Sequence, residues 1–141
     1  MPGVFISYRR QDSEWPARGL CDCLCEHFGE DRVFMDVDGI EPGEDFVDVL
    51  DDALAECDAM IALVGPCWVS ITDQSGRRRL EDPEDFVRLE IATALKRKIR
   101  VIPVLMDGAT MPGSGDLPDE LTALVRRQAV EIRAKSFRHC R

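Results

Sequence analysis

Arginine and aromatic side chains stand at the ends of two apolar segments of the sequence. Tyr8, Arg9 and Arg10 close the first of these segments, and Trp68 follows the third. A guanidinium group binds a phosphate through paired hydrogen bonds, and an aromatic ring stacks on a flat heterocycle. These residues therefore indicate a site for a ligand that carries both an anionic group and a planar ring.

A single carboxylate, Glu90, is placed beside the apolar stripe of a predicted helix. At about 100° per residue, the stripe consists of Val87, Ile91, Ala94 and Leu95. Glu90 projects from the margin of this stripe, and Phe86 lies beside it one turn earlier. Periodicity alone favours a solvated glutamate that pairs with Arg97 or with a neighbouring chain, so the pattern does not by itself make Glu90 catalytic.

Several common catalytic signatures are missing. No G-x-G-x-x-G follows the first apolar segment and no G-x-x-x-x-G-K-[ST] occurs, which removes support for redox use of a dinucleotide and for P-loop phosphoryl transfer. A response regulator needs an acidic cluster where this chain has Tyr8-Arg9-Arg10. His27 and His139 have no serine or cysteine partner in a recognisable motif, so a catalytic triad is not indicated either.

The six cysteines do not form a metal-binding pattern. Cys21, Cys23 and Cys25 fall in one predicted helix, where alternate residues point in different directions and cannot complete one tetrahedral site. The other cysteines are scattered along the chain. We therefore expect reduced thiols that act as small apolar side chains, and no bound metal.

Length and composition are those of one ordinary globular domain. The chain has 141 residues, of which 45% are hydrophobic and 32% charged. With no repeat and no linker, we expect a single domain over residues 1–141. No apolar run approaches the ~18 residues that cross a bilayer, and no secretory signal is readable, so we expect a cytoplasmic protein. Residues 134–141 start a helical pattern without finishing it, which suggests a truncated C-terminal helix in the N-terminal part of a longer multidomain protein.

The net charge of −9 opposes broad attraction to nucleic acid or to an anionic membrane. We therefore expect neither as a direct partner. A small anionic ligand held by a local basic cluster is still compatible with this charge, and Arg9-Arg10 and Arg77-Arg78-Arg79 are two such clusters.

Five short apolar segments alternate with helical patterns, which is typical of βαβ units and a parallel sheet. The predicted strands are residues 3–8, 33–36, 59–64, 101–106 and 129–132. The predicted helices run from Asp12-Ser13 to Gly29, over 44–56, from a cap at Asp82 to Arg97, and through a shorter stretch opened by Asp116 and Pro118. Pro103 cannot donate to a ladder, so its strand should lie near an edge or carry a bulge.

Ligands of open parallel sheets bind beyond the carboxyl ends of the strands, at the crevice where the strand order reverses. If the order is the flavodoxin-like 2-1-3-4-5, this crevice lies between the loop after strand one, residues 7–10, and the loop after strand three, which starts at residues 65–68. The second loop extends to residue 81, and a loop of that length in a compact domain is usually functional or mobile.

Three sequence motifs resemble those of the Toll/interleukin receptor (TIR) domain family. Val4-Phe5-Ile6-Ser7-Tyr8-Arg9-Arg10 is similar to the first conserved box, and Asp38-Gly39-Ile40-Glu41-Pro42-Gly43 resembles the second box, the BB loop. Phe86-Val87-Arg88-Leu89-Glu90 resembles the aromatic-x-x-x-glutamate pattern that carries the catalytic glutamate of enzymatic members. The motifs occur in the family's order and span nearly the whole chain.

This resemblance implies an α/β flavodoxin-like fold of three layers, with a five-stranded parallel sheet in the order 2-1-3-4-5. It also implies hydrolysis or cyclisation of NAD⁺ with release of nicotinamide, so NAD⁺ is the substrate and no cofactor is expected. By position, Glu90 would be the catalytic residue. The substrate-binding candidates are Phe5, Tyr8, Arg9, Arg10, Asp38, Trp68 and Phe86, and the BB-like loop for assembly comprises Asp38, Gly39, Ile40, Glu41, Pro42 and Gly43.

Two departures from the family pattern stand out. Phe86 occupies a position where many members carry tryptophan, and Ser136-Phe137-Arg138 is only faintly similar to the third box. The resemblance further implies self-association with other TIR domains, a fused or separate sensor domain, and a role in bacterial antiviral signalling. The alternatives are a non-enzymatic adaptor that acts through homotypic TIR contacts, and a bacterial effector that lowers host NAD⁺.

Overall fold

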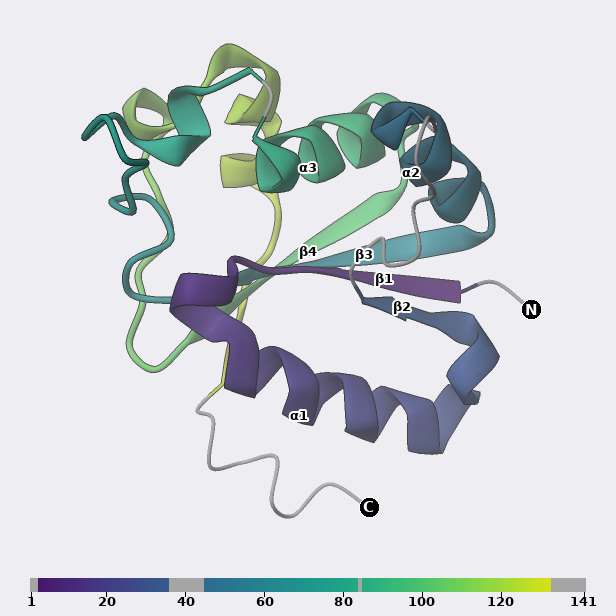
Figure 1. Ribbon diagram of the computed structural model, residues 1–141. Coiled ribbons are helices and arrows are strands. Elements are labelled where there is room, and N and C mark those ends of the chain that lie inside the picture. Colours follow the sequence, from purple (N-terminus) through teal and green to yellow (C-terminus); the bar gives the residue numbers. More distant parts are fainter. Residues whose placement is uncertain (1–2, 36–44, 84, 133–141) are drawn as a thin grey trace.

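Five parallel strands form one sheet in the order β2-β1-β3-β4-β5 (Figure 1). The computed structural model describes residues 3–35, 45–83 and 85–132. The strands are β1 (Gly3–Ser7), β2 (Val33–Met35), β3 (Cys57–Val64), β4 (Arg100–Met106) and β5 (Val130–Ile132). The five predicted strands and the flavodoxin-like order are both confirmed.

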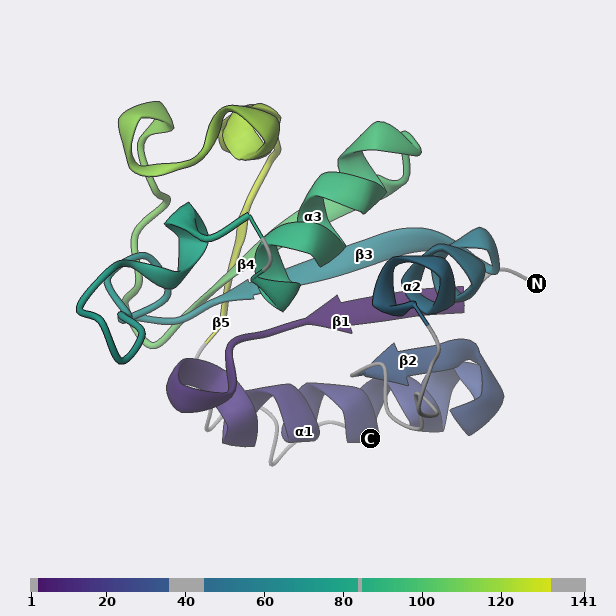
Figure 2. The same cartoon turned by 45° about the horizontal axis from the view of Figure 1, so that its top comes forward.

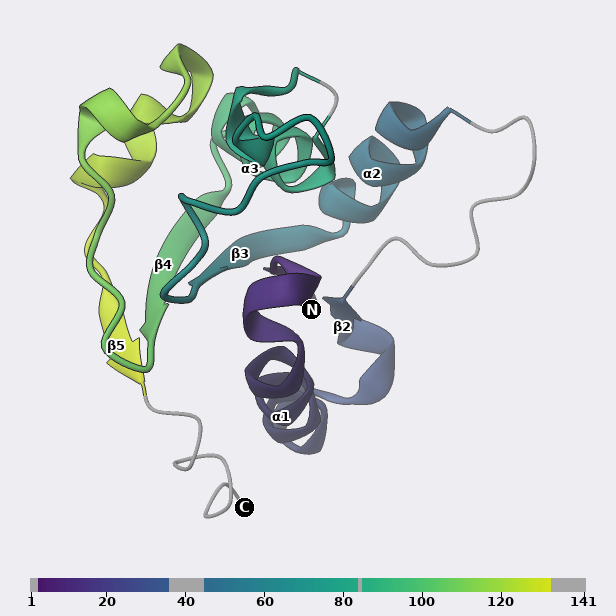
Figure 3. The ribbon, with the colours of Figure 1, turned by 60° about the vertical axis from the view of Figure 1, so that its left-hand side comes forward.

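Helices cover both faces of the sheet, which gives three layers (Figure 1, Figure 3). One face carries α2 (Phe46–Ala55), α3 (Phe86–Lys96) and the 3-10 helix η4 (Asp119–Arg126), and the other carries α1 (Arg10–Phe28). Figure 2 shows α2 and α3 packed side by side over the sheet. Within the described ranges, no helix is both long and apolar enough to cross a membrane.

The sheet is buried on both faces because each face packs against its own apolar cluster. Fully buried Leu54, Met60 and Ile91 belong to the cluster under α2 and α3. Ile6 and Leu63 belong to the cluster under α1. This two-sided burial explains why the central strands read as nearly continuous apolar runs in the sequence.

Helix α1 begins before its predicted capping residues. Its N-cap is Arg9, which makes no side-chain hydrogen bond to the helix, and Asp12 and Ser13 lie within its first turn. The first N–H groups of a helix can be satisfied without a side-chain cap. The helix can therefore start soon after β1 ends at Ser7. The helix ends as predicted at Gly29, whose φ is +95° and whose N–H donates to the Cys25 carbonyl at 2.9 Å.

The cap of α3 is Asp85 and not Asp82. The Asp85 carboxylate accepts a hydrogen bond from the backbone N–H of Arg88 at 3.2 Å. Asp82 instead ends the short 3-10 helix η2 (Arg79–Glu81). Both aspartates satisfy the local rule for a helix start, so a contact from a distant residue must select between them.

The fourth predicted helix is present as a 3-10 helix and begins slightly later than expected. The predicted opening residue Asp116 belongs to another short 3-10 helix, η3 (Ser114–Asp116). Leu121 and Leu124 of η4 are fully buried against α3 and the sheet, as their spacing predicted.

Pro103 lies in β4, which pairs with β3 on one side and with β5 on the other. Its position has no partner residue in β5. It is paired with Ala62 of β3, but the pairing of β4 with β5 starts only at Val104. The short β5 therefore leaves Pro103 at a local edge. This agrees with the expectation drawn from its missing N–H group.

The long loop after β3 is anchored to the core. Trp68 and Leu80 are fully buried in the cluster under α2 and α3, and an antiparallel bridge joins Thr72 to Arg78. Two buried apolar side chains and one bridge hold the loop in place beside the carboxyl ends of the strands.

Four of the described cysteines carry free thiols: Cys21, Cys25, Cys57 and Cys67. Burial raises the pKa of the Cys57 thiol to about 11, so this side chain stays neutral and apolar as expected. Cys23, in contrast, is disulfide-bonded, so the expectation of reduced thiols is wrong for this residue. Among the residues that the structure describes, no group of three or more metal-ligating side chains comes together.

The packing of α2 predicts a clear difference between two of its apolar residues. Replacing fully buried Leu54 with alanine removes a side chain from the core and should lower the free energy of unfolding by about 2–5 kcal/mol. Replacing Val47, which is 44% exposed on the same helix, should change it by less than about 1 kcal/mol. Urea unfolding of both variants measures this difference, and equal losses would contradict the assignment of the buried face.

Candidate active site

The carboxyl end of β1 brings a serine to the predicted catalytic glutamate. Ser7, the last residue of β1, donates a hydrogen bond from Oγ to Glu90 Oε1 at 2.8 Å. Both side chains are buried: Ser7 is 1% exposed and Glu90 is 7% exposed. Glu90 thus lies inside the protein, in contact with the end of β1, one of the two strands between which the strand order reverses.

Burial rules out the solvated alternative for Glu90. Arg97, the residue offered as its surface partner, pairs with Asp51 of α2 at 2.7 Å instead. A buried carboxylate is costly unless hydrogen bonds or charges compensate it. A hydrogen bond between Ser7 and Glu90 supplies one such compensation and fixes the orientation of the carboxylate.

Arg9 is bound inside the protein by the cap of α3. Its Nη1 and Nη2 donate to the two carboxylate oxygens of Asp85 at 2.6 and 2.8 Å. Arg9 is 2% exposed, which its position just after the apolar residues of β1 does not predict. The physical reason is Asp85, whose carboxylate provides the counter-charge that allows a guanidinium to be buried. Since Asp85 also caps α3, this ion pair holds the start of α3, the helix that contains Glu90, against the end of β1.

Two buried donors of predicted site residues have no hydrogen-bond partner among the residues that the structure describes. These are Arg9 Nε and the indole Nε1 of Trp68, in the segments that follow β1 and β3. Buried donors are nearly always paired in proteins, so each leaves capacity to bind an acceptor. Trp68 itself is 0% exposed, so its ring faces the core and does not offer a surface for stacking.

Phe86 presents an exposed aromatic face one turn before Glu90. It is 61% exposed, and its ring stacks on Phe46 of α2 with the centroids 4.3 Å apart and the planes 20° from parallel. Together with partly exposed Val47, these rings form an apolar surface at the amino ends of α2 and α3. An aromatic surface beside a buried carboxylate suits a ligand in which a flat ring is next to a positively charged centre.

The remaining predicted site residues fall into two groups. Phe5 and Tyr8 are buried on opposite faces of the sheet, Phe5 under α2 and α3 and Tyr8 under α1. Arg10 starts α1, but the position of its side chain lies outside the described part of the protein. The whole BB-like loop also lies outside the described residues; it comprises Asp38, Gly39, Ile40, Glu41, Pro42 and Gly43.

Sequence reasoning missed three residues that the structure places at this site: Ser7, Phe46 and Asp85. Ser7 belongs to the first motif and to the predicted crevice loop, residues 7–10, but the pattern gives it no role, although a serine that ends a central strand has the chemistry to orient a carboxylate. Asp85 was overlooked because Asp82 gave the same local signal. Phe46 has no local signal, since its partner Phe86 lies forty residues further along the chain.

A separate groove of about 510 Å³ lies between η2, η3 and η4, and Arg78 and Arg88 are among its lining residues. Each of these arginines is already paired with a carboxylate, Arg78 with Glu81 and Arg88 with Glu120. Because its cations are neutralised by its own walls, this groove does not have the charge of an anion site.

Comparison with known proteins places the chain in a family. The sequence matches the TIR domain family over residues 4–139, so the chain belongs to that family. Its fold is also that of solved TIR domains. No curated protein matches the sequence.

Three solved structures illustrate the shared fold. A metazoan TIR-STING receptor from C. gigas in complex with 2',3'-cGAMP is 19% identical, with a TM-score of 0.58 over 95% of this chain and 37% of that one. The TIR domains of the activated Roq1 resistosome, which directly recognises the pathogen effector XopQ, are 17% identical, with a TM-score of 0.55 over 89% of this chain and 69% of that one. A further C. gigas TIR-STING receptor is 22% identical, with a TM-score of 0.50 over 86% and 35% of the two chains. The chain thus spans little more than a third of the TIR-STING receptors.

The Arg9–Asp85 pair predicts a large effect from a small substitution. Asp85→Asn preserves a capping side chain but leaves Arg9 buried without its counter-charge, which should cost about 3–5 kcal/mol of unfolding free energy. Asp45→Asn makes the same change at the exposed cap of α2 and should have little effect, since asparagine and aspartate cap equally well. Thermal and urea unfolding of the two variants give the comparison. Equal stabilities would show that the buried pair contributes nothing.

Proposed function

We propose that this domain cleaves the bond between nicotinamide and ribose in NAD⁺, with Glu90 as the catalytic carboxylate. The observation that carries the proposal is the position of Glu90, which is buried, oriented by Ser7 and located at the carboxyl end of β1. Family membership supports the same assignment, because residues 86–90 resemble the aromatic-x-x-x-glutamate motif of enzymatic members. Products would be nicotinamide and either ADP-ribose or a cyclic ADP-ribose isomer.

One carboxylate is sufficient for this reaction. As nicotinamide leaves, the ribose gains oxocarbenium character, as in glycoside hydrolysis. A preorganised carboxylate stabilises this positive charge most strongly where water is excluded. Nicotinamide is cationic in NAD⁺ and leaves neutral, so a general acid is not required. NAD⁺ is accordingly the substrate, and no cofactor or metal takes part.

The other site residues have distinct roles in the proposal. Phe86, held by its stack on Phe46, would bind a planar ring of the substrate, and Arg10 would bind its phosphates. Arg9 would act indirectly by holding α3 through Asp85, with its free Nε directed to an acceptor of the ligand. Buried Phe5, Tyr8 and Trp68 would support these groups from the core, and Asp38 would complete the pocket from the BB-like loop.

Assembly is part of the proposed activity. Glu90 is 7% exposed, so the substrate reaches it only when its surroundings rearrange. TIR domains generally self-associate, and a neighbouring copy that contacts the BB-like loop, residues 38–43, would stabilise the open form. The setting would be cytoplasmic antiviral signalling in bacteria, with a fused or separate sensor domain as the trigger.

A non-enzymatic adaptor is the second candidate function. The apolar surface of Phe46, Val47 and Phe86 favours it, because exposed aromatic and aliphatic side chains at one place suit a protein partner. This function needs no chemistry at Glu90.

Glu90→Gln separates the two functions. The amide can still accept the Ser7 hydrogen bond, so the fold should survive, but the negative charge is lost and nicotinamide release should fall by at least about 10²-fold. Glu81→Gln, at an exposed position, is the matched control and should retain wild-type turnover. Incubation with NAD⁺ and quantification of nicotinamide give the rates. Undiminished turnover in the Glu90 variant would remove this residue from the mechanism, and no turnover in any assembled protein would favour the adaptor.

Ser7→Ala tests whether the glutamate must be oriented. A hydrogen bond to a charged group is worth about 1.5–3 kcal/mol, so its loss should lower kcat by about tenfold or more. In the Glu90→Gln background the same substitution should have a much smaller effect, because the charged partner is already missing. Ser70→Ala, an exposed serine, serves as the control. Equal effects of Ser7→Ala in both backgrounds would mean that Ser7 acts on stability alone.

A further inference from the structure

Charged side chains of opposite sign are segregated at the amino ends of the strands. Residues 45–58 contain six acidic residues and no basic one, whereas residues 96–100 contain four basic residues and no acidic one. We define an acidic face that comprises Asp51, Asp52, Glu56 and Asp58. We define a basic face that comprises Lys96, Arg97, Lys98, Arg100 and Arg127. All of these side chains are exposed except Arg127, which is partly exposed.

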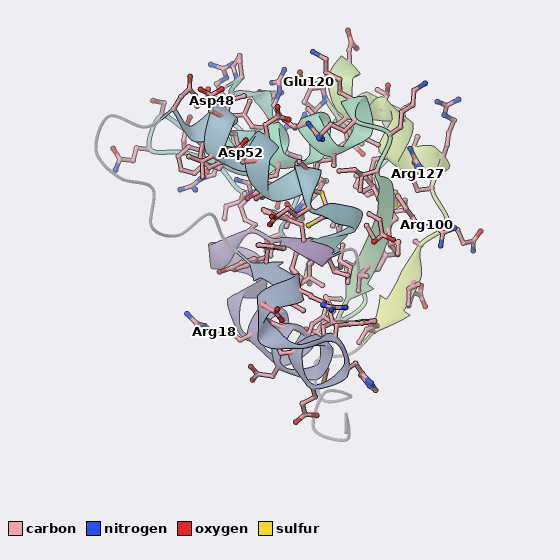
Figure 4. The ribbon with its side chains drawn as sticks, turned by 90° about the vertical axis from the view of Figure 1, so that its right-hand side faces the viewer. Arg18, Asp48, Asp52, Arg100, Glu120 and Arg127 are labelled. Atoms are coloured by element: carbon pink, nitrogen blue, oxygen red, sulfur yellow. The ribbon has the colours of Figure 1, made fainter. Side chains whose placement is uncertain are left out.

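The two faces lie next to each other on one end of the molecule. An ion pair of 2.7 Å between Asp51 and Arg97 crosses the boundary between them. Figure 4 views this end directly, with Asp52 on α2 and with Arg100 and Arg127 at the opposite edge. Within the described part of the chain, Asp52, Arg100 and Arg127 make no ion pair, so their charges are available to a partner.

The acidic face lowers the stability of helix α2 in the isolated domain. Helix α2 has no basic residue in its last turn, and Asp52 and Glu56 instead bring negative charge to the negative end of the helix dipole. Helix α3 follows the favourable arrangement, with Asp85 at its start and Lys96 at its end. A local conflict of this kind is expected where a residue serves a partner rather than the fold.

We propose that two copies of this chain pair through these faces about a two-fold axis, so that the acidic face of each copy contacts the basic face of the other. Adjacent faces of opposite sign are self-complementary, which is the condition for an isologous interface. A polyanion such as nucleic acid fits less well, because the acidic face beside the basic one repels it. The net charge of −9 keeps copies apart in every orientation that lacks this match.

Pairing at this end leaves the candidate active site open. Glu90 is held by Ser7 at the carboxyl end of β1, whereas Arg100 begins β4 at the amino end of the sheet. The apolar surface of Phe86 and Val47 also remains free for a second contact. Dimers of this type can therefore join further copies through another surface. The pairing does not depend on NAD⁺ cleavage, so its failure and the failure of the proposed activity are distinguishable.

The association should be weak and sensitive to salt. Individual exposed ion pairs contribute little, and at physiological ionic strength charges are screened over about 8 Å. Complementary charges mainly set the orientation and rate of encounter. Sedimentation of the full chain at rising concentration should show a monomer–dimer equilibrium at low salt that shifts to monomer at high salt.

Charge reversal gives a decisive test by sedimentation. Asp52→Lys and Arg100→Glu each place like charges together twice per dimer, so each variant alone should dimerise at least about tenfold more weakly. Mixed in equal amounts, the two variants should form a heterodimer, because Lys at 52 then faces Glu at 100 and the native Arg100 faces the native Asp52. The controls Glu26→Lys and Arg18→Glu make the same charge changes on α1 and should dimerise as the wild type does.

Circular dichroism of each variant establishes that it is folded, since all four positions are exposed. Dimerisation that survives either reversal would overturn the proposal. A mixture of the two folded variants that stays monomeric would overturn it as well, as would a wild-type chain that is monomeric at low salt at every concentration.

Discussion

The ion pair between Arg9 and Asp85 fixes the relation of the sheet to the helix that carries Glu90. Arg9 lies two residues after the end of β1, and Asp85 is the cap of α3, so one bidentate contact joins residues 76 positions apart in the sequence. With the start of α3 held there, Glu90 comes one turn later to the level of Ser7. The pair thus fixes the start of α3 against the end of β1, and the Ser7 hydrogen bond then orients the Glu90 carboxylate.

Polar burial at this site has a cost that the rest of the fold must offset. Arg9, Ser7 and Glu90 are the buried polar or charged side chains among the described residues, and they gather at the carboxyl ends of β1 and its neighbour β3. The apolar clusters on both faces of the sheet supply the compensating stability. Within the described part of the chain, Arg9 Nε and Trp68 Nε1 have no hydrogen-bond partner and add further cost in the segments after these strands. Concentration of such costs at one site is typical of a ligand-binding centre rather than of a folding nucleus.

Sequence patterns were sufficient for the sheet but not for the contacts at the site. Apolar runs and their spacing predicted all five strands, and the position of Glu90 beside the buried stripe followed from helical period. The burial of Arg9 could not be predicted, because its partner Asp85 is distant in sequence and Asp82 offers an equivalent cap. Trp68 was expected at a ligand, yet its loop uses the indole to reach the core. Local rules state what a residue can do, and only the tertiary partner determines which option is used.

Helix α3 connects the candidate active site at one end of the domain with the basic face at the other end. At its start lie the cap Asp85, the exposed ring of Phe86 and the buried Glu90, and at its end lies the basic face. Its last turn is also tied to α2 through Arg97 and Asp51, and α2 in turn supports Phe86 through Phe46. A contact that displaces Asp51 from Arg97 would therefore act on the same helix pair whose opposite end holds the aromatic stack. Because packed helices move as rigid units, assembly at the amino ends of the strands has a direct physical route to the surroundings of Glu90.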